Sequence, residues 1–386
     1  MSAKDQTPRP DKERLLAKLR GFQKRTVAHV VRRLFDPEGS SRFLVADEVG
    51  LGKTLIARGV ISEIVDRRWD SVKRLDVLYV CSNSALAREN LRKLHIGGTS
   101  LEGTRLTLLP KQLPHFDSKL NFVSFTPGTA LQISGYGRVD ERVVLYALLR
   151  QEHGDPAWLK NLLQGDVEHN RWRNGYLSYL PEVADDWSKK FHRRLKKDRD
   201  IQKSLRWASE TLVRADARLD DEQRSRRYKT VGTLRKLLAR TCIDALQPDI
   251  IILDEFQRFK DLLSTGDDET AQTELSELAR ELFDYRTPEG NRVATLLLSA
   301  TPYRWFATTD ESFEGEPYDD FLDTMKFLID DDARFLLLKG AIARYRQALL
   351  GATVGSSESV TAARDELQRL LKRVMVRMER IDSTDA

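Results

Sequence analysis

The sequence predicts an α/β protein whose parallel β-sheet is flanked by helices. Five short apolar runs have the character of buried strands, and segments of helical periodicity separate them. Because a buried parallel strand is covered on both faces, it reads as a continuous run of Val, Ile and Leu, as in "DIIILDE" and "VATLLLSAT". Polar residues follow these runs, and ligands of α/β proteins bind at the carboxyl ends of the strands. The runs span residues 43–46, 77–81, 122–125, 250–253 and 295–298.

Composition excludes several classes of protein. The chain has 386 residues, enough for two or three domains, and its 40% apolar content supports packed cores. Its apolar runs are shorter than the ~20 residues that cross a bilayer, and its N-terminal segment lacks the apolar centre of a signal peptide, so we expect a cytoplasmic protein without a membrane partner. A net charge of +5 permits a polyanionic partner without requiring one. Cys81 and Cys242 show no metal-ligand spacing with the His residues, so we expect neither a zinc site nor a disulfide framework.

The segment "DEVGLGKT" joins the first strand-like run to a segment of helical period. It departs from the phosphate-binding pattern GxxxxGK[ST] at its first position, where Asp47 replaces Gly. Two glycines let the backbone approach an anion, the lysine supplies a positive charge to the β and γ phosphates of ATP, and the threonine offers a hydroxyl to Mg²⁺ at a helix N-terminus. A tight turn with an incidental lysine is the alternative. The predicted ATP-binding residues are Gly50, Leu51, Gly52, Lys53 and Thr54.

Asp254 and Glu255 follow the fourth strand-like run directly. Two adjacent carboxylates at the end of a buried strand indicate a polar cleft, since charged groups are rarely buried without a partner. An Asp at this point can hold Mg²⁺ through water, and the neighbouring Glu can orient and deprotonate an attacking water. A pair of solvated charges at a strand end is the alternative. Together with Lys53 and Thr54, the pair favours a site for Mg²⁺ and ATP.

The motifs "LRGFQ", "ADEVGLGKT", "LDEFQ" and "SAT" occur in this order along the chain. The order resembles the first RecA-like domain of superfamily-two helicases and translocases, most closely the Swi/Snf-type branch, over residues 15–130 and 245–305. The resemblance implies that Gln23 reads the adenine edge and that Lys53, Asp254 and Glu255 catalyse ATP hydrolysis, with Mg²⁺ on Thr54 and Asp254. It also implies that hydrolysis is coupled to movement on nucleic acid. The implied coupling residues are Gln257, Ser299 and Thr301.

Two further segments fit this resemblance less closely. "VCSNSALARENLRKL" follows the second strand-like run, where the family has a nucleic-acid-contacting motif, so the resemblance implies contacts by Ser82 and Asn83. "SFTPGTAL" follows the third run, where many members carry a Thr-Pro-Gly turn. There Gly128 can present a backbone N–H to a phosphate, and Thr126 a hydroxyl. A plain Pro-Gly turn explains the second segment equally well.

Residues 187–240 carry 18 Lys or Arg and 7 Asp or Glu, a net charge of +11. A minimal RecA-like domain does not need these residues, and we expect a basic, helix-rich insertion over residues 136–244. Its basic residues, mixed with Trp187, Phe191 and Trp207, can follow a phosphate backbone. Alternatively, the cations are only solvated and the aromatic rings pack inward. The candidate nucleic-acid contacts are Lys189, Lys190, Arg193 and Arg194.

We expect the RecA-like domain to comprise residues 1–135 and 245–310, and residues 311–386 to form a helical extension. Residues 261–334 have a net charge of −13, which would repel a polyanion, so we expect them away from any nucleic acid. By resemblance, the ATP site lies between two RecA-like domains, and the second supplies arginines that stabilise the transition state. Only "IDSTDA" follows Arg380, so a separate chain could supply that domain.

These inferences predict the ATP-binding half of a nucleic-acid-dependent ATPase that acts on double-stranded DNA. A regulatory or scaffold protein that binds nucleotide and nucleic acid without hydrolysis is the alternative from another class.

Overall fold

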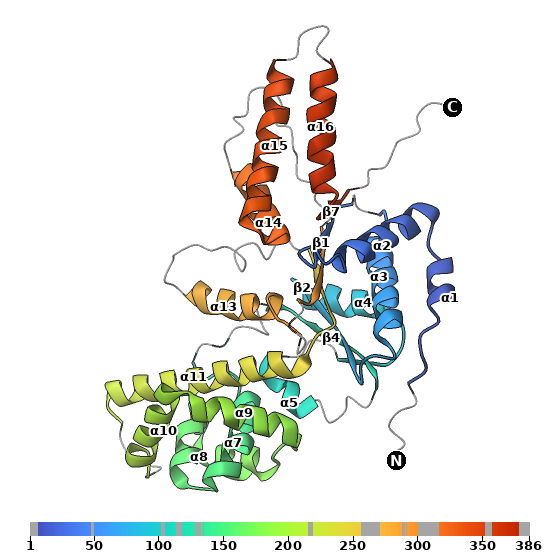
Figure 1. Ribbon diagram of the computed structural model, residues 1–386. Helices are drawn as coiled ribbons and strands as arrows, with labels where there is room; N and C mark the ends of the chain where they lie inside the picture. Colours follow the sequence, from blue (N-terminus) through green and yellow to red (C-terminus); the bar gives the residue numbers. More distant parts are fainter. Residues whose placement is uncertain are drawn as a thin grey trace.

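The computed structural model has at its centre a seven-stranded sheet in which all neighbouring strands run parallel, in the order β3-β4-β2-β5-β6-β1-β7 (Figure 1). The strands are β1 (Arg42–Val45), β2 (Leu75–Cys81), β3 (Thr99–Leu101), β4 (Leu120–Phe125), β5 (Ile250–Asp254), β6 (Ala294–Leu298) and β7 (Met375–Val376). The described residues are 7–47, 50–101, 105–112, 118–127, 133, 135–214, 219–255, 271–287, 290, 292–299, 316–351 and 357–377.

The predicted α/β class and parallel sheet are confirmed. The five predicted strands are β1, β2, β4, β5 and β6, and they form the middle of the sheet. The sequence did not predict β3 and β7, which form its two edges. They contain only 3 and 2 residues, so neither has a continuous apolar run that could identify it.

Alternate residues of the strands face two separate hydrophobic cores. In β5, Ile250 and Ile252 belong to one core, and Ile251 and Leu253 belong to the other. Helices cover both faces of the sheet, which is why the strands are apolar on both sides. The first core is covered by α1 (Lys12–Ala17), α2 (Gly21–Leu34), α3 (Lys53–Arg68) and α4 (Ser84–Leu94).

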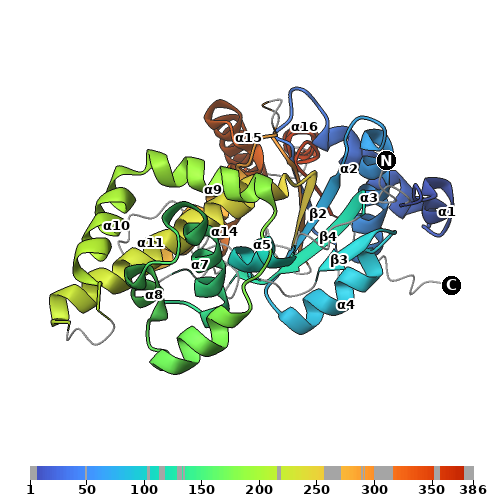
Figure 2. The same cartoon turned by 90° about the horizontal axis from the view of Figure 1, so that it is seen from below.

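The second face carries a helical bundle whose chain lies between β4 and β5 (Figure 2). Within it, Trp187 and Phe191 are buried, and Trp207 packs against the same core. The aromatic rings therefore pack inward, as in the second of the two interpretations of this segment. Between β4 and β5 the described helices are α7 (Val139–His153), α8 (Ala157–Gln164), η3 (Arg171–Gly175), η4 (Tyr176–Ser178), α9 (Asp185–Lys197), α10 (Arg199–Thr211) and α11 (Asp221–Leu246). The same core also includes residues of η1 (Leu106–Leu108) and α5 (Leu109–Gln112), which precede β4, and of α13 (Ala271–Phe283), which follows β5.

A buried ion pair joins the bundle to the segment that follows β4. Arg235 of α11 and Glu141 of α7 are both 1% exposed, and their side chains lie 2.9 Å apart. The same guanidinium donates to the carbonyls of Ile133 and Gly135 at 2.9 and 3.1 Å. A charge this deeply buried needs a counter-ion and hydrogen-bond acceptors, and here these partners join the bundle to this segment.

The C-terminal helices are α14 (Glu316–Ile329), α15 (Asp332–Leu350) and α16 (Ser357–Leu371), and the last two form a hairpin that projects from the sheet (Figure 1). The chain then returns as β7, where Leu44 and Ala46 of the β1 segment donate to the carbonyls of Val374 and Val376 at 2.9 Å. This segment therefore contributes a strand beside β1, in addition to the predicted helices. In the described parts of the chain, no helix combines the length and apolar character needed to cross a bilayer.

Part of the acidic segment lies at the amino-terminal end of β1. Arg42, the first residue of this strand, is buried and pairs with Asp284, and its guanidinium lies 3.6 Å from Asp330. It also donates to the carbonyl of Phe327 at 2.7 Å. These acidic residues thus lie near the amino-terminal end of β1, whereas the loop that follows β1 begins at the carboxyl end of the strand.

A buried ionic cluster holds the amino-terminal ends of β2 and β5 together. The Asp76 carboxylate lies 2.6 Å from Arg74 and accepts a 3.0 Å hydrogen bond from Asn121. The Asp76 N–H donates to Asp249 at 2.8 Å, and Asp249 pairs with Arg68 at 2.7 Å. Burial raises the pKa of Asp76 to about 7 against the opposing effects of Arg74 and Asn121, and Asp249 adds to the rise.

This raised pKa makes stability depend on pH. Between about pH 4 and pH 7 the folded chain keeps a proton on Asp76 that the unfolded chain has released, so this group's contribution to stability falls as pH rises. Asp76→Asn is therefore expected to remove on the order of 2 kcal/mol of the difference in unfolding free energy between pH 5 and pH 8. Urea denaturation of both proteins at both pH values measures this difference. Equal differences in the two proteins would contradict the assignment.

Candidate active site

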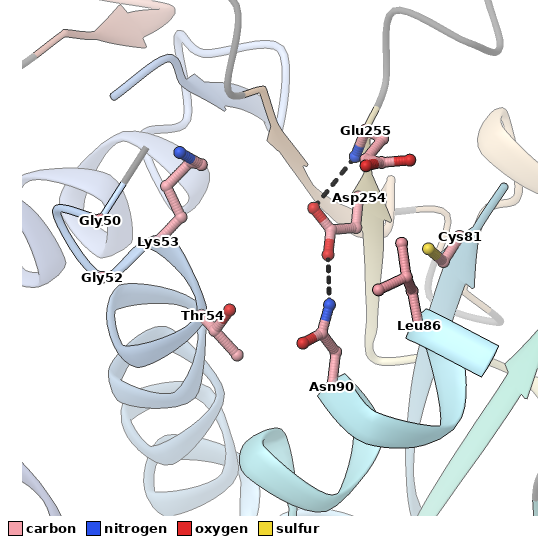
Figure 3. A pocket seen from close by; sticks show the side chains of 9 residues that line it. All are labelled: Gly50, Gly52, Lys53, Thr54, Cys81, Leu86, Asn90, Asp254 and Glu255. Atoms are coloured by element: carbon pink, nitrogen blue, oxygen red, sulfur yellow. Dashed lines mark hydrogen bonds between the residues drawn. The ribbon is translucent and has the colours of Figure 1, made fainter. Parts of the chain in front are cut away.

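A pocket of about 350 Å³ lies at the carboxyl ends of β1, β2 and β5 (Figure 3). The loop after β1 and the first turn of α3 form one side, and β5 and α4 form the other. Because β6 lies between β1 and β5 in the sheet, the two sides are separated by the width of one strand. The lining residues are Gly50, Gly52, Lys53, Thr54, Cys81, Leu86, Asn90, Asp254 and Glu255.

Both glycines of the loop have backbone conformations that favour glycine. Gly50 has φ 90° and Gly52 has φ 85°. A Cβ on Gly52 would lie 2.6 Å from Nε2 of Gln23, so a side chain would also displace that residue. Gly52 precedes α3 and has no side chain that could cap the helix. The loop therefore leads into a helix N-terminus with its backbone open to an anion.

Gln23 is hydrogen-bonded to the backbone of the loop and does not line the pocket. It is 4% exposed, its Nε2 donates to the carbonyl of Leu51 at 3.0 Å, and its Oε1 accepts from the N–H of Arg20 at 3.0 Å. The structure therefore shows Gln23 fixing the loop conformation. The adenine contact implied by the resemblance stays a prediction.

Lys53 begins α3 and folds back over the loop. Its Nζ donates to the carbonyl of Asp47 at 2.7 Å. Burial lowers the pKa of Lys53, while the carboxylates of Asp47 and Asp254 act to raise it. Both acidic groups thus favour the charged ammonium that phosphate binding requires. Thr54 lies on the same side of the pocket, with Asp254 on the other (Figure 3).

The Asp254 carboxylate is held by three donors. Its Oδ2 contacts the hydroxyl of Tyr79 and accepts from Nδ2 of Asn90 at 3.1 Å. Its Oδ1 accepts from the N–H of Glu255 at 3.0 Å. Burial raises the pKa of Asp254, and the Tyr79 and Glu255 hydrogen bonds partly offset this rise because they stabilise the carboxylate.

Glu255 has φ 54°, a left-handed conformation that is uncommon for a residue with a side chain. Its carboxylate accepts a hydrogen bond of 2.8 Å from the hydroxyl of Ser82. Asp254 and Glu255 both line the same pocket. Uncommon backbone conformations of this kind cluster at functional sites.

The predicted nucleic-acid contacts after β2 have structural partners. Ser82 bonds to Glu255, and Oδ1 of Asn83 caps α4 by accepting from the N–H groups of Ala85 and Leu86 at 2.8 and 3.2 Å. Thr126 and Ser299 are buried, and neither lines the pocket. The remaining predicted residues of these motifs, Gly128, Gln257 and Thr301, lie outside the described residues.

The four predicted basic contacts lie on α9, and none of them lines the pocket. Lys189 and Arg193 are exposed. Arg194 pairs with Asp244 of α11, its Nε lying 3.0 Å from the carboxylate, and Lys190 approaches the Asp244 carbonyl at 3.5 Å. Two of the four residues therefore help to join helices, and two face solvent.

Sequence reasoning missed Tyr79, Cys81, Leu86 and Asn90. A partial signal for Tyr79 exists, because a tyrosine inside a buried strand needs a partner for its hydroxyl. Asn90 directly precedes Leu91, which belongs to the buried stripe of α4 with Ala87 and Leu94. Its contact with Asp254 spans 164 residues of sequence, which no local pattern reveals.

A metal at this site would need ligands from its substrate. Among the described residues, no group of three or more His, Cys, Asp and Glu residues could hold a metal ion. Mg²⁺ commonly binds one or two carboxylates and completes its coordination with water and substrate phosphates. The pocket, with Asp254 and the Thr54 hydroxyl, fits that second type of site.

Comparison with known proteins adds no family assignment. No protein-family model matches the chain. No curated protein matches it at a significant level. The residues that line the pocket are therefore the basis for a functional proposal.

Proposed function

We propose that this chain is the ATP-binding half of a nucleic-acid-dependent ATPase of the helicase and translocase class, built on a RecA-like fold. One observation carries the proposal. The glycine loop with Lys53 and Thr54, and the Asp254–Glu255 pair about 200 residues later in the printed sequence, line the same pocket. A turn with an incidental lysine gives no reason for this convergence, whereas hydrolysis of a phosphate anhydride needs both parts.

Each residue has a physical role in the proposed reaction. The ammonium of Lys53 and the N-terminus of α3 attract the phosphates. Thr54 and Asp254 offer a hydroxyl and a carboxylate oxygen, the hard ligands that Mg²⁺ prefers, from opposite sides of the pocket. Magnesium bound there would neutralise charge on the phosphates. Glu255 orients the attacking water and accepts its proton, once its carboxylate is free of the Ser82 hydroxyl.

The proposed polyanionic partner is double-stranded DNA. The exposed cations of α9 support this part of the proposal, because cations in solvent can neutralise phosphates. Lys189 and Arg193 are exposed, whereas Arg194 already pairs with Asp244. The buried aromatic rings of this helix leave no role for Trp187 and Phe191 in stacking on bases. The proposed contacts are therefore to the phosphate backbone and independent of sequence.

Reversal of charge at Lys189 and Arg193 is expected to weaken duplex DNA binding. The double variant Lys189→Glu/Arg193→Glu should bind all DNA sequences less tightly and reduce the slope of log K against log salt by about 2, since each phosphate contact releases about one counterion. Fluorescence anisotropy at several salt concentrations measures both quantities. Lys339→Glu/Lys372→Glu is the control, because it makes the same change in charge at an exposed site of α15 and at an exposed site just after α16. An unchanged slope in a folded variant would show that the α9 cations are only solvated.

The proposal as a whole is tested by calorimetry with ATP and Mg²⁺, followed by steady-state hydrolysis with and without duplex DNA. Binding of ATP that depends on Lys53 is the expected result. The absence of binding at millimolar ATP would refute it.

A further inference from the structure

The donors around Asp254 leave little of its carboxylate available to a metal. A carboxylate has roughly four lone-pair sites, two on each oxygen. Oδ2 accepts hydrogen bonds from both the Tyr79 hydroxyl and the Asn90 amide, and Oδ1 accepts one from the Glu255 N–H. Among the residues that the structure describes, Oδ2 therefore has two donors and Oδ1 has one, which leaves Oδ1 as the oxygen more available to a metal ion or to a water bound to one.

The three groups on Oδ2 contact one another. The Nδ2 amide of Asn90 donates to both the Tyr79 hydroxyl oxygen and Oδ2 of Asp254, each at 3.1 Å, and the Tyr79 hydroxyl donates to the same Oδ2. The opposite orientation of the amide would place its oxygen against the carboxylate, so the contacts determine the orientation. Tyr79 is 0% exposed, and Asn90 stands on a helix whose N-terminus is capped by Asn83. Packing therefore fixes Tyr79, and Asn90, which is half-buried at the pocket wall, is held by its two hydrogen bonds.

We propose that Asn90 and Tyr79 are positioning residues that make Asp254 a ligand through one oxygen only, and that they thereby select Mg²⁺ over Ca²⁺. The inference rests on the proposed function, because it concerns the metal that accompanies the nucleotide. Mg²⁺ keeps several waters and binds one carboxylate oxygen readily. Ca²⁺ is larger, accepts more ligands and often binds both oxygens of a carboxylate, which the two donors on Oδ2 prevent. Figure 3 shows Asn90 reaching from α4 to Asp254 on the side of the pocket opposite Thr54.

The experiment measures metal preference through nucleotide binding. A fluorescent ATP analogue is titrated onto the full chain at increasing Mg²⁺ or Ca²⁺, and the ratio of the two half-saturating metal concentrations is compared between variants. Asn90→Leu removes the amide at similar volume, and Tyr79→Phe removes only the hydroxyl. Both are expected to shift the ratio toward Ca²⁺ by about 10-fold, the usual size of such effects from residues that orient a metal ligand. Asn174→Leu, the same change at an exposed position of the bundle, should leave the ratio unchanged.

The outcomes separate this inference from the proposed function. An unchanged ratio in folded Asn90→Leu and Tyr79→Phe, with nucleotide still bound, would overturn the inference alone. If Asn90→Leu fails to fold, Tyr79→Phe decides the question by itself. Failure of the wild type to bind the analogue with either metal would refute the proposed function and the inference with it. Displacement of Mn²⁺ by each metal, followed by electron paramagnetic resonance, gives a second readout that needs no turnover.

Discussion

Hydrolysis of ATP by this chain alone is expected to be slow, and a second RecA-like domain is expected to accelerate it about 10³- to 10⁵-fold. Of the described residues that line the pocket, Lys53 is the one cation, and none is an arginine. The groups proposed to bind phosphate and to activate water therefore line the pocket. Stabilisation of charge on the transferred phosphoryl group, a large part of catalysis, has to come from an arginine elsewhere, in the same or another chain.

Steady-state ATPase assays measure this effect on the chain alone and with an added second domain, with and without duplex DNA. Glu255→Gln is expected to remove most of the gain, lowering turnover by about 10²- to 10⁴-fold, because an amide cannot accept the proton of the attacking water. ATP should stay bound, since the amide oxygen can still accept the Ser82 hydrogen bond. Glu89→Gln, at an exposed position of α4, is the matched control.

Two results would contradict the hypothesis that a second RecA-like domain completes this pocket as an ATPase site. Brisk DNA-stimulated turnover by a verified monomer would mean that an arginine of the chain itself completes the site. Tight ATP binding with no turnover, even with a second domain and DNA, would favour the regulatory or scaffold function instead.

Removal of the Lys53 ammonium is expected to weaken binding of Mg²⁺-ATP by about 10- to 100-fold, which corresponds to the ~1.5–3 kcal/mol of a hydrogen bond to a charged group. Lys53 begins α3 beside both glycines, and the acidic groups around it favour its charged form. Calorimetry on Lys53→Ala measures the loss. The fold should survive, because the hydrogen bond from this ammonium to the carbonyl of Asp47 lies within the loop and joins no other element of the fold.

The control for this variant is Lys93→Ala, which removes an exposed lysine of α4 paired with Glu89. Its ATP affinity should equal that of the wild type. Equal affinity in Lys53→Ala and the wild type would show that the loop is a tight turn with an incidental lysine. The proposed function would then lose the observation that carries it.

The sequence by itself determined the central strands and the two motifs that end β1 and β5. Strand β5 is an example, because a short run of consecutive apolar residues is typical of a strand that is buried on both faces. The loop after β1 is another example, because φ values of 90° and 85° favour glycine, and the two glycines can be recognised in the sequence. Such features depend on residues that are neighbours in the chain. They can therefore be read without knowing the fold.

Only the tertiary structure decided which of these features meet. It placed β6 between β1 and β5, added β7 beside β1, and brought Tyr79 and Asn90 onto Asp254. It also turned the ring of Phe191 inward and paired Arg194 with Asp244, so that only part of the basic segment faces solvent. Each of these contacts joins residues that are distant in the sequence, and the residues next to each of them in the chain do not specify its partner. The hydrogen bonds and burial of a side chain depend on the groups that pack against it, and the tertiary fold determines which groups these are.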